Sequence, residues 1–264
     1  MTINGTITNN GTITNNGTIT INNTGILNNT GIINNTYYPV SYVGIINNAG
    51  TINNDHIFNN SYTSSRLNNS GKFYNNTSGI LNNTSGAKII NNNGGELTNN
   101  GTIASGGDVV ESEIINSGQI YNNKNIRIIE YNIFTNYGTI TNNESGSEFR
   151  IDGLATLNNN NGGIIINTNS GAILNIGAFN NVNGGIIYNN NSATITNDED
   201  GTSAFNNNGI IYNNTNAIIT NDNTFTNSGT INSPASSGGC GVGIINGTNQ
   251  ILGTINTANN DCPT

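Results

Sequence analysis

The chain of 264 residues has an unusual composition: about a quarter of it is Asn, 34 residues are Gly, and only 8% are charged. Charged residues normally make up about 25% of a globular domain, and Gly about 7%. The net charge of −8 with six basic residues argues against nucleic-acid binding, which needs clustered Lys and Arg. No apolar run approaches the length of about 18 residues that indicates a membrane-spanning helix.

The N-terminus, from Met1 to Gly5, lacks the basic and apolar regions of a signal peptide. The repeat described below begins by Thr2, with no polar cap before it. A strand without a cover is an open edge that recruits other chains. We therefore expect either a piece of a longer repeat protein or a unit that stacks head to tail.

A six-residue unit, GTITNN, is repeated over residues 5–20. The alternation in Thr6-Ile7-Thr8 predicts a short strand with Ile7 pointing inward. The Asn-Asn-Gly that follows predicts a corner, since Asn and Gly tolerate a left-handed backbone. Inward Asn side chains at such corners are expected to bond to the Asn one coil above and below; we assign this role to Asn9, Asn189 and Asn213.

The segment 37–43 interrupts the repeat and carries Tyr37, Tyr38 and Tyr42. Tyr-rich loops suit ligand contact, and they also serve as lids packed on a coil. Both interpretations stay open. If the loop contacts a ligand, the candidate partner is a cell-surface or glycan ligand.

Catalytic and metal-binding patterns are missing from the sequence. His56 is the only histidine, which excludes His-based triads and multi-histidine metal sites. The acidic residues 198–200 lack the full EF-hand spacing for calcium and are interpreted as a solvated corner. We predict no enzyme, no metal and no cofactor.

A longer period overlies the short one between residues 120 and 232. Inward Ile at 140, 165, 187, 211 and 231 marks one strand of each coil. Two further strands are marked by Ile151, Ile173, Ile195 and Ile219, and by Leu157, Phe179, Phe205 and Phe225. Three strands per coil predict an all-β protein, a single three-sided β-solenoid with coils of about 18–25 residues over 1–232. At about 4.8 Å per coil, some eleven or twelve coils make a rod of roughly 55 Å.

Outward positions beside the first of these strands are apolar. If the coils stack in register, they form one stripe, made of Ile164, Ile166, Ile186, Tyr188, Ile210 and Tyr212. Contiguous apolar surface usually marks contact with a partner, so we predict that the stripe binds another copy of the chain. The alternative is that β-propensity alone selects these residues.

Outward Thr-x-Thr pairs suggest a second function. They occur at Thr6/Thr8, Thr12/Thr14, Thr18/Thr20 and Thr139/Thr141. This pattern resembles that of ice-binding solenoids, in which such pairs line one face in successive coils. Pairs six residues apart fall on successive sides of a three-sided coil, so ice binding ranks below a structural role.

Beyond residue 232 the repeat fades, and the only two cysteines, Cys240 and Cys262, follow. An even count within one terminal segment predicts a disulfide that closes a C-terminal cap over 233–264. Two free thiols are the alternative. A disulfide would imply maturation in an oxidising compartment.

The repeat chemistry over residues 4–232 resembles that of filamentous-haemagglutinin and autotransporter-type β-solenoids, whose coils also contain Asn, x, Gly, x, Ile. Asn-rich solenoids also occur in viral fibres. The resemblance implies an adhesive or structural protein on the outside of a cell or virion, and it assigns no functional residues. We predict a rigid fibre or adhesin subunit.

Overall fold

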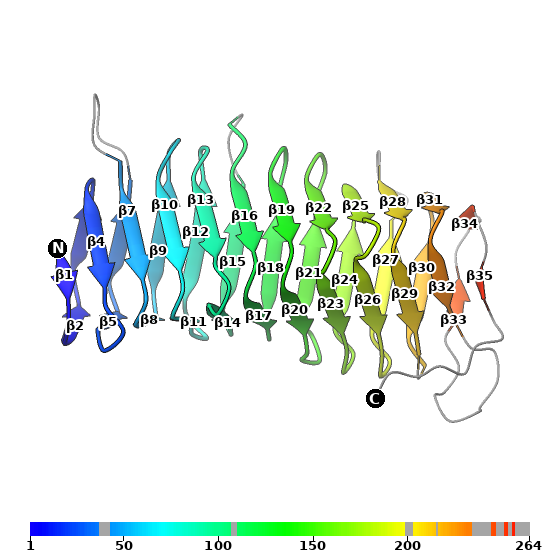
Figure 1. Cartoon of the computed structure of the whole chain (residues 1–264), viewed down its shortest axis with the longest axis horizontal. Coiled ribbons are helices and arrows are strands. Elements are labelled where there is room, and N and C mark those ends of the chain that lie inside the picture. The colour runs from blue at the N-terminus through cyan, green and yellow to red at the C-terminus, as the bar shows by residue number, and fades with distance from the viewer. Residues whose placement is uncertain are drawn as a thin grey trace.

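The computed structural model describes residues 1–36, 43–106, 110–198, 203–214, 216–233, 244–246, 251–252 and 255–256. The described residues form short strands and no helix, and the strands assemble into three parallel sheets. Strands adjacent in sequence lie in different sheets, and every third strand pairs, so the chain winds as one continuous solenoid (Figure 1). The predicted three-sided β-solenoid is confirmed.

We name the three sheets A, B and C. Sheet A contains β1 (Thr2–Ile3), β4 (Thr18–Ile21), β7 (Ile45–Asn48), β10 (Arg66–Asn69), β13 (Lys88–Asn91), β16 (Glu113–Asn116), β19 (Ile133–Asn136), β22 (Thr156–Asn159), β25 (Ala178–Asn181), β28 (Ala204–Asn207), β31 (Thr224–Asn227) and β34 (Ile251–Leu252). Sheet B contains β2 (Thr6–Asn9), β5 (Ile26–Asn29), β8 (Thr51–Asn54), β11 (Lys72–Asn75), β14 (Glu96–Asn99), β17 (Gln119–Asn122), β20 (Thr139–Asn142), β23 (Ile164–Asn167), β26 (Ile186–Asn189), β29 (Ile210–Asn213), β32 (Thr230–Asn232) and β35 (Ile255–Asn256). Sheet C contains β3 (Thr12–Asn15), β6 (Ile32–Asn35), β9 (Ile57–Ser61), β12 (Ile80–Thr84), β15 (Thr102–Ser105), β18 (Asn125–Ile128), β21 (Glu148–Ile151), β24 (Ala172–Asn175), β27 (Thr194–Asn197), β30 (Ile218–Asn221) and β33 (Ile244–Asn246).

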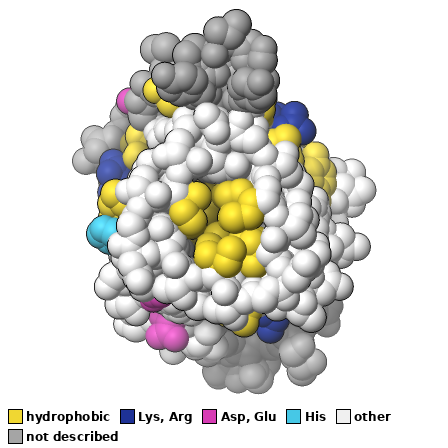
Figure 2. All heavy atoms as spheres, turned by 90° about the vertical axis from the view of Figure 1, so that its left-hand side faces the viewer, with side chains coloured by type: hydrophobic (Ala, Val, Ile, Leu, Met, Phe, Trp, Pro, Cys, Tyr) yellow, Lys and Arg dark blue, Asp and Glu magenta, His cyan; other side chains and the backbone are white. Residues whose placement is uncertain are grey.

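Most strands have four residues, of which the second and fourth point inward. In β20, Ile140 and Asn142 are fully buried, whereas Thr139 and Thr141 are half-buried on the outside. The second position supplies an apolar core of Ile, Leu and Phe that runs along the rod. Phe rings stack within it: the centroids of Phe179 and Phe205 are 4.4 Å apart. A view onto the N-terminal end shows these apolar side chains inside a ring of polar and backbone atoms (Figure 2).

The fourth position forms ladders of buried Asn. In sheet B the Nδ2 of Asn9 donates to the Oδ1 of Asn29 at 2.7 Å, and this pattern continues without a break through Asn189 and Asn213. It ends at Ser233, whose Oγ accepts from Asn213 at 3.3 Å. From Asn9 to Asn189 the ladder amides also donate to a backbone carbonyl, as from Asn189 to Ile218 at 3.1 Å. Both donors of the amide are thus satisfied inside the rod, which removes the cost of burying it.

The ladders of the other two sheets have gaps filled by Ile. Ile21 occupies the ladder position below Asn48, and Ile151 the one below Asn175. An Ile donates no hydrogen bond, so the Oδ1 atoms of Asn48 and Asn175 are buried without a partner. At Asn48 and at Asn175 a ladder of Asn side chains therefore begins directly above an Ile, and the first Oδ1 of that ladder has no donor.

Three sequence-based expectations need correction. Ile151 does not stack on Ile173: the inward residue below Ile173 is Phe149, and Ile151 lies below Asn175. The rest of the three predicted rows pair as expected. Paired residues in successive coils are 18 apart between Thr2 and Thr20 and 27 apart between Thr18 and Ile45. Ala178 and Ala204 are paired 26 residues apart. The upper limit of 25 was therefore slightly too low, and the coil that leaves β4 is the longer of these two because it contains the segment 37–42.

The third correction concerns the corner glycines. At Gly138, which has no positive φ, a Cβ atom would lie 2.2 Å from the carbonyl oxygen of Gly118 in the coil below. The same close approach occurs at Gly31, at 2.1 Å from Gly11. The glycine of the repeat is thus required by the contact between stacked backbones. Positive φ occurs at other residues of the longer corners, such as Gly94 and Gly184.

Strands β33, β34 and β35 add one further strand to each sheet beyond residue 232. Cys240 and Cys262 lie outside the described residues. The predicted cap over 233–264 and its disulfide therefore stay predictions.

Candidate functional site

The apolar stripe lies on the outward face of sheet B, on β23, β26 and β29. The register pairs Ile164 with Ile186 and Ile210, and pairs Ile166 with Tyr188 and Tyr212. The stripe is bounded by Thr139 and Thr141 on one side and by Thr230 and Asn232 on the other. The six side chains, Ile164, Ile166, Ile186, Tyr188, Ile210 and Tyr212, are half-buried along three consecutive strands. The structure therefore brings together all the residues of the predicted stripe.

Two tyrosines of the stripe stack on each other. The rings of Tyr188 and Tyr212 stack with centroids 5.1 Å apart and an interplanar angle of 9°. Burial, together with the neighbouring Tyr212, raises the pKa of Tyr188 above its ordinary value.

The middle of the rod has a different outward surface. All six basic residues lie between Arg66 and Arg150, and they are paired with acids in several places. Lys88 of β13 binds Glu113 of β16 at 2.6 Å. Arg127 and Arg150, which are stacked neighbours in sheet C, both bind Asp152, and this hydrogen bond raises the pKa of Arg150.

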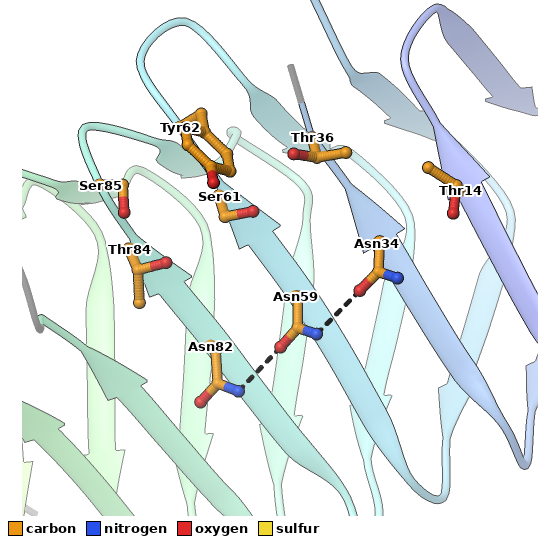
Figure 3. Close-up of a pocket in the computed structure, with 9 residues that line it drawn as sticks. All are labelled: Thr14, Asn34, Thr36, Asn59, Ser61, Tyr62, Asn82, Thr84 and Ser85. Atoms are coloured by element: carbon orange, nitrogen blue, oxygen red, sulfur yellow. Dashed lines mark hydrogen bonds between the residues drawn. The ribbon is translucent and has the colours of Figure 1, made fainter. Parts of the chain in front are cut away.

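A polar hollow on sheet C was missed by the sequence analysis. It has a volume of about 490 Å³ and is lined by outward residues of β3, β6, β9 and β12 and of the corners after them, namely Thr14, Asn34, Thr36, Asn59, Ser61, Tyr62, Asn82, Thr84 and Ser85. Three amides cross it in a row, with Nδ2–Oδ1 distances of 2.9 Å from Asn59 to Asn34 and from Asn82 to Asn59 (Figure 3). In the sequence these three Asn are seen only as outward residues of three separate repeat units. The register of the strands is needed to show that they are neighbours.

The Thr-x-Thr pairs do not stack on one another. Thr6, Thr12 and Thr18 lie in sheets B, C and A, and each is followed in the next coil by an Ile. The pair at Thr139 and Thr141 is followed by Ile164 and Ile166. These pairs therefore form no array over successive coils, and the geometry does not favour ice binding.

The structure does not test the remaining candidates of the sequence analysis, the Tyr-rich segment and the acidic corner. Tyr37, Tyr38 and Tyr42 lie outside the described residues, as do residues 199 and 200. Within the described ranges, no group of three or more His, Cys, Asp or Glu side chains is placed to hold a metal ion. Over the same part of the chain, no helix is long and apolar enough to cross a membrane.

Comparisons with known proteins add one distant likeness. No family model matches the chain, and no curated protein matches it. Among solved structures, the crystal structure of the TibC-catalysed hyper-glycosylated TibA55-350 fragment is similar at 18% identity, over 96% of this chain and 98% of that one, with a TM-score of 0.20. At that score the likeness carries no argument about function. The resemblance to filamentous-haemagglutinin and autotransporter-type repeats stays a prediction.

Proposed function

We propose that this protein is a non-enzymatic structural subunit, a rigid rod displayed outside a cell or on a virion, where it serves as a fibre or adhesin. The observation that carries the proposal is the apolar stripe on β23, β26 and β29. The backbone ladders of the three sheets give length and stiffness, and the stripe supplies a contact along the rod. Fold alone does not determine function, so the proposal depends on this surface.

Several features of the stripe favour a second copy of the chain as its partner. Its side chains are uncharged, and its Ile and Tyr lie in two parallel rows along the rod. A straight row on one rod can pack along the same row on a second rod. An interface formed by the same patch on two copies requires such self-complementarity. Aromatic residues are also enriched in protein interfaces. Lateral pairing of rods is therefore the assembly that we propose first.

End-to-end stacking is the second mode of assembly in the proposal. In the first coil, Ile7 and Ile13 pack against the core but are only partly buried, whereas Leu27 and Ile33 above them are fully buried. Another coil placed against this end, from a longer chain or from a second copy, would cover Ile7 and Ile13 and extend each sheet by one strand.

The lateral contact is tested with the double variant Ile186→Lys and Tyr212→Lys. Sedimentation velocity of the wild type is expected to show dimers or larger species, and the variant is expected to sediment as a monomer. The matched control is Thr194→Lys with Thr220→Lys, which places the same charges on the corresponding outward positions of sheet C in the same two coils. Unchanged sedimentation of the stripe variant, or an equal loss in the control, would overturn lateral pairing through the stripe.

A further inference from the structure

The polar hollow on sheet C has the composition of a site for a neutral ligand. None of the described residues that line it is charged. The lining consists of Asn amides, Ser and Thr hydroxyls and one aromatic ring, which selects neither an anion nor a cation. This chemistry matches a ligand that is rich in hydroxyl groups.

The amide row keeps hydrogen-bonding capacity for such a ligand. Asn59 and Asn82 each use one N–H in the row. Each amide has two donors and an acceptor oxygen, so the second N–H of Asn59 and of Asn82 is unused among the described residues, as are both N–H groups of Asn34 and the Oδ1 of Asn82. Sugar hydroxyls both donate and accept, and an amide supplies both functions at one position.

Tyr62 supplies an apolar surface beside the amides. Its side chain is 54% exposed and stands beyond the end of β9, above Ser61 (Figure 3). Its backbone has φ of +74°, and Ser64 two residues later has +77°. Positive φ in a non-glycine residue costs about 1–3 kcal/mol and is often found at binding sites. A Tyr ring presents an apolar face with a polar tip, and a sugar ring has an apolar C–H face that packs on such a surface.

We propose that this hollow binds a neutral carbohydrate chain, which runs along the rod axis across β6, β9 and β12. Successive amides are about 4.8 Å apart, the spacing of neighbouring strands, and this is close to the length of one sugar residue in an extended chain. One sugar then faces each amide, and one of them stacks on Tyr62. The proposal is independent of the lateral contact, because the hollow and the stripe lie on different sheets.

The molecule contains an internal control for this site. Sheet A carries an equivalent outward row, in which Asn180 donates to Asn158 at 2.9 Å and Asn206 donates to Asn180 at 3.0 Å. The residues three positions after this row, where Tyr62 follows Asn59, are Asn161, Asn183 and Gly209, so the row lacks an aromatic side chain there. A variant at Asn180 removes one amide from a stacked row without touching the hollow.

The test uses a printed array of neutral and anionic glycans, with the full chain as the labelled probe. We expect neutral glycans to bind, and we expect Tyr62→Ala and Asn59→Leu each to lower the affinity at least about tenfold. Tyr62→Phe keeps the ring and should lose no more than about threefold, and Asn180→Leu should bind like the wild type. Circular dichroism of each variant checks that the rod has folded.

Three outcomes would overturn the proposal: no bound glycan, binding of anionic glycans alone, or a loss in Asn180→Leu equal to that in Asn59→Leu. The stripe variant with Lys at 186 and 212 should keep glycan binding, and Asn59→Leu should keep the sedimentation of the wild type. Failure of this site and failure of lateral pairing are therefore seen in separate measurements.

Discussion

Asn side chains are stacked both inside the rod and on its outer surface, and the two sets differ in how fully they are hydrogen-bonded. Inside, Asn99 is fully buried, donates to Asn122 and to the carbonyl of Asn125, and accepts from Asn75, all within 2.8–2.9 Å. Outside, Asn180 is half-buried and makes one bond to each neighbour in its row. The same side chain thus builds the rod on the inside and keeps free donors for contacts on the outside.

The corner glycines connect strands that carry both inner and outer Asn. Of the substitutions considered, replacing such a glycine is expected to lower the free energy of unfolding most. In Gly138→Ala the new Cβ meets a backbone oxygen at 2.2 Å, which cannot move without separating two coils. We expect the free energy of unfolding to fall by about 4 kcal/mol or more, measured by urea denaturation. Gly5→Ala is the matched control, since it lies at the same corner of sheet B and its Cβ meets nothing within 4 Å. Equal stability of the two variants would contradict the proposed role of glycine.

The comparison of inner and outer Asn is tested directly by one substitution in each set. Asn99→Leu leaves the Oδ1 of Asn122 buried without a donor and removes the ladder acceptor of the buried Asn75 amide. Each such group costs about 1–3 kcal/mol, so we expect a loss of about 3 kcal/mol in unfolding free energy. Asn180→Leu should cost no more than about 0.5 kcal/mol, as is usual for outward positions. Similar costs in the two variants would show that the inner ladder has no special role.

Filling a gap in a ladder has the smallest expected effect. Ile151→Asn places a donor below the unpaired Oδ1 of Asn175. It also loses buried apolar surface, and the Oδ1 of the new amide lies above Ile128, which donates nothing. We therefore expect a loss of about 1–2 kcal/mol. Ile173→Asn, on the adjacent coil of the same sheet, puts an amide between Phe149 and Ile195 and should cost about 3 kcal/mol. Equal destabilisation by Ile151→Asn and Ile173→Asn in thermal or urea unfolding would contradict the proposed role of the ladder position.

The sequence predicts most of the fold because each strand has an inward apolar residue at a fixed place in the unit. The row from Ile140 to Ile231 was therefore assigned correctly. Ile151 was misassigned because β21 has two apolar inward residues, Phe149 and Ile151, and alternation does not tell which one stacks on Ile173. The role of the glycines was also missed, since a close approach between coils depends on three-dimensional stacking.

The candidate surfaces were predicted only in part for a similar reason. The stripe was found because Ile and Tyr are conspicuous on outward positions of an Asn-rich chain. The hollow on sheet C was not found, since Asn34, Asn59 and Asn82 look like every other Asn of the repeat. What distinguishes them is the neighbouring Tyr62 and the register of three strands.

The outer surfaces of two parts of the rod also differ. Between Arg66 and Asp152, charged residues and ion pairs occupy outward positions, and charge keeps such faces hydrated. On β23, β26 and β29 the same positions in sheet B are Ile and Tyr. The inward pattern is the same in both parts, so the fold does not explain the difference. The explanation that we propose is a partner for the apolar part.

Electron microscopy of the purified wild-type protein tests the central claim, that the rod is a building block, most directly. We expect rods that lie side by side in pairs or larger bundles, with or without end-to-end extension, and we expect them to disperse in the double variant at Ile186 and Tyr212. Single, separate rods of the wild type at the same concentration would contradict it.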